Sequence, residues 1–343
     1  MDAVLVIWIV SIGLILLEAM ILAGLVARRL VEMSSQRRKA RNRRLANRLI
    51  ETYLAGKLSA SQVQRRISAP VLIEQTARRA AAAPPTQRAR LRHLATDLDW
   101  PQLRPMLQAR ASQKRLRGVY LLSFFEIPEV EQALDTVLRS DPDGDIRLAA
   151  AKGLSQMARL PALPTTLDAL RDSIQNRSRI VYSIVRNLPA DRIGELEALY
   201  QSQDWRYRLL AIDALGHVEI PRDDILKQAV EDSHLEVRSQ ALRAIGQRNL
   251  QLAAPEVVAK LDDPAWPVRL QAARVAGMLS IDAALPRLRE MLDDKHWWVR
   301  FRAAESIYAL GPHGRDVLAA SAARHDDAGD VASLVLMERG MSA

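Results

Sequence analysis

The sequence predicts an all-α protein in which one N-terminal transmembrane helix is followed by an α-solenoid of about seven helix pairs. Three observations point to this fold class. Apolar residues make up 49% of the chain but aromatic residues only 4%, and the Ala and Leu that dominate such a mix favour helices. Residues 3–27 form one long apolar run. The rest of the chain repeats a helical pattern about every 30 residues, as solenoids do.

Composition and charge exclude several kinds of function. The chain of 343 residues has no cysteine, which rules out disulfides, iron–sulfur clusters, thiolate zinc sites and a thiol nucleophile. The net charge is +9, but residues 28–48 carry +8, residues 1–27 carry −2, and the other 295 residues hold only +3. The high pI therefore comes from one short segment and does not indicate a basic body built for nucleic acid.

Residues 3–27 are predicted to span a membrane as a retained anchor. This run contains 15 Leu, Ile or Val residues and a single charge, Glu18. As a helix it would be about 37 Å long, enough to cross a hydrocarbon core of about 30 Å. A cleaved signal peptide fits less well because the chain opens with Met1-Asp2, without the positive start that such peptides need.

The basic juxtamembrane segment, residues 28–48, sets the expected topology. Basic flanks stay in the cytoplasm, so we expect a single-pass protein of the bacterial inner membrane with its N-terminus outside and its body in the cytoplasm. The segment is also expected to contact anionic lipid headgroups. The candidate residues for this contact are Arg37, Arg38, Lys39, Arg41, Arg43 and Arg44. A nucleic-acid-binding arm is the alternative, but no aromatic residue is interleaved to stack on a base.

Glu18 is a candidate for a contact inside the membrane. An acidic side chain in a spanning helix commonly marks a functional contact. Ala19 and Ala23 lie on a face of small residues that would let another helix approach closely. The alternative is that Glu18 is simply protonated and has no partner.

The body of the chain is an internal repeat. Seven aligned segments are each apolar at their first, fifth, sixth and ninth positions, which lie on one stripe of a helix. They begin at Leu116, Ile146, Ile180, Tyr207, Val237, Val268 and Val299, at spacings of 27 to 34 residues. The fifth position is usually alanine, which lets neighbouring helices pack closely.

Each repeat is predicted to be two antiparallel helices. A second amphipathic stretch precedes each aligned segment, and a turn rich in Asp and Pro separates the two. In one such turn, Asp263 and Pro267 are placed to cap and open the second helix.

The expected domains are a helical stalk and N-terminal cap over 49–101, the repeat array over 102–312, and a C-terminal helical cap over 313–343.

The turn aspartate and the Val-Arg pair that follows it resemble those of HEAT-repeat proteins, specifically the short bacterial, phycobilisome-lyase-like type. Three units carry the full motif: Asp232 with Val237-Arg238, Asp263 with Val268-Arg269, and Asp294 with Val299-Arg300. The unit at Ile180 departs from it, with Val181 where arginine is expected. The resemblance implies that these arginines and aspartates form ladders between successive repeats. It therefore implies a structural role for Arg147, Arg208, Arg238, Arg269 and Arg300.

No catalytic constellation is found. The six histidines are not paired at metal-ligand spacing, and the sequence has no Gly-rich phosphate loop and no nucleophile elbow. We therefore expect no metal, no cofactor and no enzymatic activity.

The sequence also contains a row of tryptophans that the apolar repeat pattern does not require. Trp205, Trp266 and Trp297 occupy the same repeat position, and Trp298 adds a second ring. One interpretation is that each ring packs under the preceding turn as a wedge between repeats. The other is a partner-binding ridge, because Trp and Arg are enriched in interface hot spots. On that interpretation the candidate partner-binding residues are Trp205, Trp266, Trp297, Trp298, Arg208, Arg269 and Arg300.

Together these features favour a membrane-anchored cytoplasmic scaffold or adaptor whose partners are proteins, including a membrane protein or complex. One alternative is a HEAT-like lyase or enzyme subunit that acts on a bound chromophore or protein substrate. A further alternative is nucleic-acid binding through the basic juxtamembrane segment.

Overall fold

The computed structural model describes residues 20–340, apart from 21, 23, 25, 27, 30–32, 35, 39, 85, 88, 89, 92, 93, 95–102, 126, 177 and 219–221. Within that part of the chain, no helix is both long and apolar enough to cross a lipid bilayer. The predicted span over 3–27 lies mostly outside the described residues, and so do Glu18, Ala19, Ala23 and Lys39.

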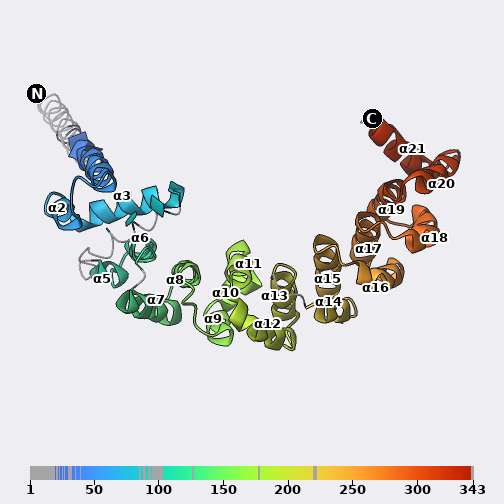
Figure 1. Cartoon of the computed structure of the whole chain (residues 1–343), viewed down its shortest axis with the longest axis horizontal. Helices are drawn as coiled ribbons and strands as arrows, with labels where there is room; N and C mark the ends of the chain where they lie inside the picture. The colour runs from blue at the N-terminus through green and yellow to red at the C-terminus, as the bar shows by residue number, and fades with distance from the viewer. Residues whose placement is uncertain are drawn as a thin grey trace, which may run out of the picture. The chain divides into compact units, whose positions relative to one another are not determined.

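The chain divides into two compact units, residues 1–137 and 138–343. This division falls within one helix, whereas the sequence analysis places the start of the repeat array at residue 102. In unit 1 the longer described helical segments are residues 40–54, α2 (Ala60–Gln64), α3 (Ala69–Ala82), α5 (Arg104–Leu107), α6 (Ser112–Leu122) and the greater part of α7 (Pro128–Ser140) (Figure 1).

Unit 2 is built of helix pairs, as predicted. α8 (Gly144–Gln156) is the second helix of its repeat. After it, each first helix is followed by a second helix that lies beside the second helix of the next pair. In chain order the first helices are α9 (Leu163–Ala169) with α10 (Arg171–Gln175), α12 (Ile193–Tyr200), α14 (Asp223–Ala229), α16 (Ala254–Ala259), α18 (Leu285–Glu290) and α20 (Pro312–Ala322). Their second helices are α11 (Arg179–Arg186), α13 (Trp205–Leu215), α15 (Leu235–Gln247), α17 (Trp266–Met278), α19 (Trp297–Ala309) and α21 (Asp327–Gly340).

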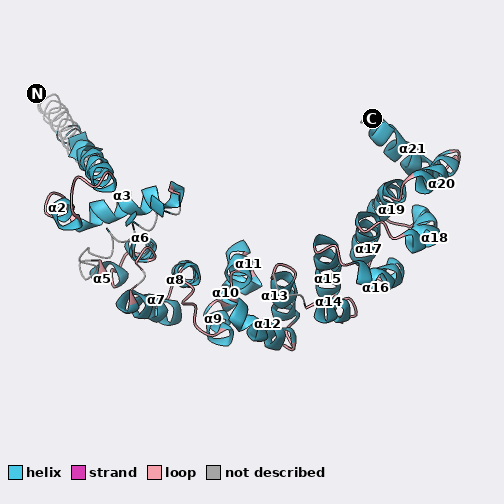
Figure 2. Cartoon of the chain, viewed as in Figure 1, coloured by secondary structure: helices cyan, strands magenta, loops and turns pink. Residues whose placement is uncertain are grey.

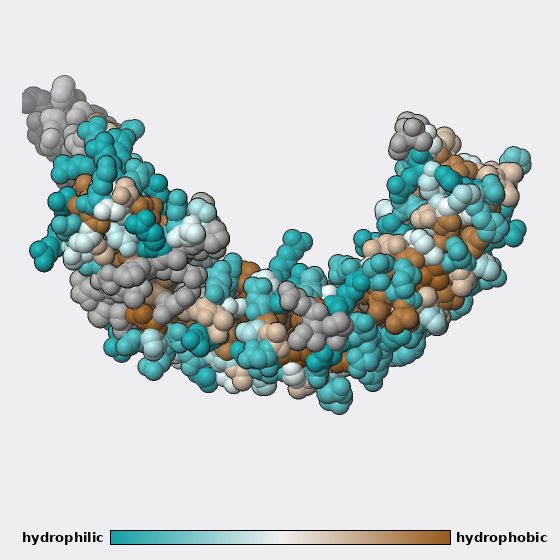
Figure 3. Space-filling view, viewed as in Figure 1, coloured by the Kyte–Doolittle hydropathy of each residue, from teal (hydrophilic) through white to brown (hydrophobic). Residues whose placement is uncertain are grey.

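The helix pairs form two layers within unit 2. The second helices α11, α13, α15, α17 and α19 lie in one layer and the first helices in the other, with short loops between them (Figures 1 and 2). On the face shown in Figure 3, polar residues cover most of the surface and apolar residues show between them. The core of unit 2 therefore lies between the two layers and between successive pairs, as expected for a stack whose single units cannot bury their stripes alone.

The alanine positions of the repeat explain how closely the second helices pack. Five equivalent alanines, one in each of five second helices, are fully buried: Ala150, Ala211, Ala241, Ala272 and Ala303. Gly277 lies still closer to its neighbour, since a Cβ placed there would be 2.9 Å from the Cα of Ser306 in the next second helix. Small side chains therefore set the distance between repeats.

Several second helices end in the same way. Ala158, Asn249 and Ser280 each lie two residues past a second helix with a positive φ, at 55°, 52° and 51°. The amide of the residue that follows each of them donates to a carbonyl five residues earlier, as in Leu250 N–H to Ile245 O at 3.0 Å. This left-handed turn satisfies the last carbonyls of the helix and reverses the chain toward the next pair.

The C-terminal helices continue the array. The sequence analysis expects a cap over 313–343, and α20 and α21 form a helix pair there. Arg300 of α19 donates to the carboxylate of Asp327, the first residue of α21, at 2.9 Å. This contact joins the last pair to the ladder described below.

Candidate partner-binding surface

The arginines of the Val-Arg pairs form a ladder of ion pairs between repeats. Arg208 donates to both oxygens of Asp232 at 2.7 and 2.8 Å, Arg238 to those of Asp263 at 2.8 and 2.9 Å, and Arg269 to those of Asp294 at 2.8 and 3.1 Å. In each case the other terminal nitrogen, Nη1, donates to the carbonyl six residues earlier, in the turn before its own helix. Each guanidinium thus connects the turn before its own helix with the corresponding turn of the next repeat.

The aspartates of the ladder also order the turns that they belong to. The Oδ1 of Asp263 accepts the backbone N–H of Ala265 at 2.9 Å, just before α17 begins. The sequence analysis places Asp263 as the cap of this helix, but the residue before the helix is Ala265, and Asp263 lies two residues further back. Pro267 is in the first turn of α17, as predicted. Asp232 and Asp294 accept the amides of His234 and His296 in the same way.

This geometry bears on the arginines proposed to contact a partner. The side chains of Arg208, Arg269 and Arg300 are nearly buried, and each donates to an aspartate of the next repeat. Because most of their N–H groups already donate to these aspartates and to turn carbonyls, these arginines support the fold more directly than they offer a binding surface. The ladder role that the family resemblance implied is therefore seen in the structure, and a partner contact by these arginines stays a prediction.

Two carboxylates of the ladder, Asp232 and Asp294, have lowered pKa values. Burial raises the pKa of Asp232, but the hydrogen bonds from Arg208 and from the His234 amide outweigh it, so that its pKa lies below the ordinary value. The pKa of Asp294 is lowered for the same reasons, with Arg269 and the His296 amide as donors. Both carboxylates are therefore held in their charged form.

These shifts predict an acid-sensitive solenoid. A carboxylate whose pKa is lower in the folded state stabilises the fold above its unfolded pKa of about 3.9, and this contribution is lost as the pH falls through the folded pKa. We expect the thermal unfolding midpoint of the full chain, followed by circular dichroism, to be steady between about pH 7 and 5 and to fall below about pH 4. The double variant Asp232→Asn/Asp294→Asn should melt lower at neutral pH and show a shallower acid fall. An unchanged acid fall in that variant would contradict the assignment.

The tryptophans begin the second helices. Trp205, Trp266 and Trp297 are the first residues of α13, α17 and α19, and Leu235 begins α15. Trp205 stacks on His234, with ring centroids 3.9 Å apart and planes at 3°. Trp266 stacks on His296 at 5.2 Å and 28°. Each histidine directly precedes the second helix of the following repeat. These two rings therefore pack between repeats, but on the turn of the following repeat and not under the preceding turn that the wedge interpretation expects.

Three of the tryptophans are nevertheless exposed. Trp266 is 37% accessible, Trp297 40% and Trp298 59%. Trp297 stacks on Phe301 at 5.1 Å and meets Trp298 edge to face at 4.7 Å. We call Trp266, Trp297 and Trp298 the aromatic ridge. It lies at the starts of two adjacent second helices, and Trp298 is its most accessible ring.

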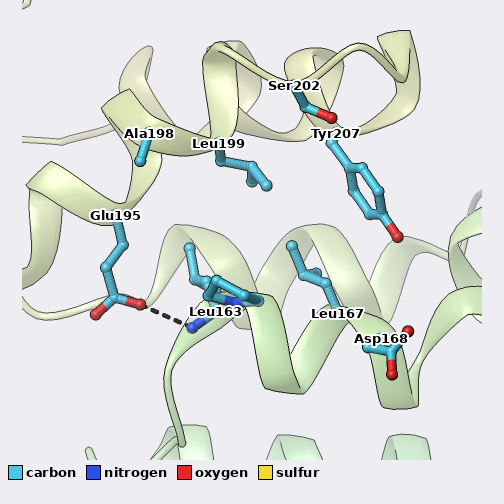
Figure 4. A pocket seen from close by; sticks show the side chains of 9 residues that line it. Leu163, Leu167, Asp168, Glu195, Ala198, Leu199, Ser202 and Tyr207 are labelled. Atoms are coloured by element: carbon cyan, nitrogen blue, oxygen red, sulfur yellow. Dashed lines mark hydrogen bonds between the residues drawn. The ribbon is translucent and has the colours of Figure 1, made fainter.

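A pocket of about 330 Å³ opens between the first helices α9 and α12 (Figure 4). Leu163, Leu167 and Leu199 line its apolar walls, and Tyr207 of α13 closes one end. It lies beside the unit in which Val181 replaces the ladder arginine. There Asp204 pairs with Arg206 of its own helix, at 3.3 Å, and not with an arginine of the preceding repeat. The sequence shows the irregular spacing of this unit but not the pocket that accompanies it.

The charged residues of this pocket are paired. Arg192 donates to Glu195 at 2.6 Å, and the pKa of Glu195 is lowered by these hydrogen bonds and by the Leu163 amide at 2.7 Å, against the effect of burial. Arg171 pairs with Asp168 at 2.6 Å. The pocket can therefore accept an apolar group, and the Glu195 carboxylate beside it is held in its charged form.

The basic segment, residues 28–48, is helical where it is described. Arg37, Arg38, Arg41, Arg43 and Arg44 are all exposed. Arg37, Arg41 and Arg44 are spaced four and three residues apart, so they form one stripe along the helix. Ala46, Leu49 and Ile50 are buried against the rest of unit 1. The segment therefore offers a solvent-facing row of cations.

No group of three or more metal-ligating side chains is found among the described residues. His234 and His296 serve as stacking partners of the tryptophans, a role that the sequence analysis did not assign. The signal was available: each of these histidines follows a row tryptophan by one repeat length and directly precedes the next second helix.

Comparison with known proteins identifies the repeat. Residues 254–337 match the family model of HEAT repeats. No curated protein matches the chain. Among solved structures, a mutant of Kap121p aligns with 86% of this chain at a TM-score of 0.55 and 14% identity. Kap121p bound to Nup53p aligns with 86% at a TM-score of 0.54 and 15% identity.

These likenesses establish the fold. The chain spans 39% of the length of Kap121p in both structures. At such low identity the resemblance shows a HEAT-type α-solenoid and nothing about activity. The matched family region covers the last three helix pairs, of which the first two carry the complete Val-Arg motif, at Val268-Arg269 and Val299-Arg300. The phycobilisome-lyase-like subtype stays a prediction.

Proposed function

We propose that this HEAT-repeat chain is a membrane-tethered scaffold or adaptor, in which a helix over residues 3–27 holds the solenoid at the cytoplasmic face of the bacterial inner membrane. The proposed role is binding, without catalysis. The hydropathy of residues 3–27 and the basic flank after them support the tether and its orientation. The exposed arginine stripe at Arg37, Arg41 and Arg44 supports contact of this flank with anionic lipid headgroups.

The observation that carries the binding role is the exposure of the aromatic ridge. Large aromatic side chains bury considerable area on association, and Trp is enriched among residues that dominate interface energies. Trp298 is 59% accessible although it stands within a well-packed helix pair. The Kap121p structure with Nup53p shows that a solenoid of this fold can hold a protein partner. A protein partner docked on the ridge would bury Trp298.

We expect Trp298→Ala to weaken partner capture by about tenfold or more, as loss of a hot-spot side chain does. Trp298 is the suitable residue because its ring contacts only Trp297 among the aromatic pairs, whereas Trp266 also holds His296. The measurement is quantitative crosslinking pull-down of the full chain from intact membranes, expressed per folded molecule.

Leu252→Ala is the matched control. Leu252 is 77% accessible and precedes the first helix α16, away from the starts of the second helices. It should leave capture unchanged. If Trp298→Ala captures as much partner as the native chain, the ridge is not the binding surface and the proposal fails.

A further inference from the structure

The positive charge of the chain is confined to unit 1. Residues 1–137 contain 22 basic and 11 acidic side chains, a net charge of +11. Residues 138–343 contain 27 basic and 29 acidic side chains, a net charge of −2. The unit that contains the predicted tether is thus the one suited to an anionic surface.

Unit 1 also contains the larger of the cavities described here. It has a volume of about 720 Å³ and lies among the helical residues 40–54, α3 and α6. Three arginines, one from each of these segments, surround one carboxylate, Glu74. Arg78 reaches Glu74 Oε1 at 3.0 Å, Arg43 reaches the same oxygen at 3.5 Å, and Arg117 contacts Oε2.

The charges in this cavity are not balanced. Three guanidinium groups face one carboxylate, which leaves a net charge of about +2 and more N–H donors than two oxygens can accept. The side chains of Arg43, Arg78 and Arg117 are each at least half exposed, whereas Glu74 is largely covered. The excess positive charge is therefore accessible to an anion from solvent.

Apart from Gln113, the rest of the cavity wall is formed by apolar and aromatic side chains. Leu116, Tyr120, Leu121 and Phe124 of α6 and the turn after it lie beside the arginines, and Tyr120 is 55% accessible. An inorganic anion would use the arginines and leave these side chains in water. A ligand that joins a phosphate to hydrocarbon would use both parts.

We infer that this cavity binds the headgroup of an anionic phospholipid. The phosphate oxygens accept hydrogen bonds from Arg78 and Arg117, and the glycerol and first acyl carbons lie against Tyr120 and Phe124. The inference rests on the membrane tether of the proposed function, because the tether holds unit 1 beside the lipid. Glu74 acts as a built-in competitor that keeps the arginines in place when no lipid is bound.

The experiment uses the full chain in nanodiscs of phosphatidylcholine and phosphatidylglycerol in equal amounts. Native mass spectrometry of the released protein measures the ratio of the two lipids that it retains. We expect the native chain to retain phosphatidylglycerol preferentially. Arg78→Gln and Arg117→Gln should each lower the ratio by about tenfold, the loss of one charge-assisted hydrogen bond to phosphate. Arg110→Gln, at an exposed arginine outside the cavity, is the control and should change nothing.

Glu74→Gln separates lipid binding from a structural role of the cluster. If the arginines bind phosphate, removing the competing carboxylate should raise the ratio. If the cluster only holds α3 to α6, Glu74→Gln and Arg117→Gln, which remove the two sides of the contact between these helices, should lower the ratio alike, and the inference is overturned. Equal retention of both lipids by the native chain would overturn it too. Inorganic phosphate that displaces phosphatidylglycerol at equal concentration would show a simple anion site and reject the lipid.

A failed incorporation of the chain into nanodiscs would count against the tether and so against the proposed function. Insertion without a preference for phosphatidylglycerol would count against this inference alone. Partner capture by the aromatic ridge is measured separately, in unit 2, and depends on neither lipid.

Discussion

Replacing Asp263 by alanine is expected to destabilise the solenoid by about 3–5 kcal/mol, the range seen when one partner of a buried ion pair is removed. Asp263 is 5% exposed, and its carboxylate accepts two hydrogen bonds from Arg238 and one from the Ala265 amide. The alanine variant leaves the Arg238 guanidinium nearly buried without its counter-charge. It also leaves the amide before α17 without its acceptor. Urea unfolding of the full chain, followed by circular dichroism, measures the loss.

The neighbouring Asp262 is the matched control. It is largely exposed and pairs with Arg287, itself partly exposed, at 2.6 Å. Because such surface pairs contribute between zero and about 1 kcal/mol, Asp262→Ala should have little effect. A double variant, Arg238→Met/Asp263→Leu, should recover part of the loss, since it removes both charges together. Equal destabilisation by Asp262→Ala and Asp263→Ala would show that the ladder does not hold the repeats together.

The ladder of ion pairs is a part of the structure that could be predicted from the sequence. The repeat of Asp and Val-Arg was sufficient, through the HEAT resemblance, to predict which residues pair between repeats. It was sufficient because the pairing follows from the repeat length: an arginine in one second helix meets the turn aspartate 24 or 25 residues later. The burial of Ala241 and Ala272 followed from helical periodicity in the same way.

The tryptophan row could be located but not interpreted from the sequence. Whether a ring is covered depends on which side chain the next repeat places before its second helix. His234 covers Trp205 and His296 partly covers Trp266. Trp298 has no such neighbour and stays exposed. Such contacts join residues about one repeat apart, and periodicity predicts their proximity but not the geometry of the rings.

The cavity in unit 1 was beyond the sequence analysis for a different reason. Arg43, Arg78 and Arg117 lie in three helical segments with no shared motif, so only the fold brings them together around Glu74. Of these residues, only Arg43 was singled out from the sequence, as part of the basic segment. Outside the repeats there is no period that relates one helix to the next.

Gly277→Val is expected to destabilise the chain by about 1–3 kcal/mol through overpacking. A Cβ at Gly277 would lie 2.9 Å from the Cα, Cβ and Oγ of Ser306, closer than such atoms approach in folded proteins. Ser306 is buried in the neighbouring helix α19, so it has no free space to move into. The two helices must therefore separate, and in a solenoid each interface supports the next.

This separation should also reach the aromatic ridge. Trp266 begins α17 and Trp297 begins α19, the two helices that Gly277→Val would force apart. We expect faster hydrogen exchange in both helices, and weaker partner capture even per folded molecule.

Gly194→Ala is the control, and it should change the free energy of unfolding in the opposite direction. Gly194 lies in α12 with no atom near its Cβ position, so alanine there should stabilise by about 0.5–1 kcal/mol. If Gly277→Val is as stable as the native chain in urea, close packing at glycine does not fix the distance between these repeats.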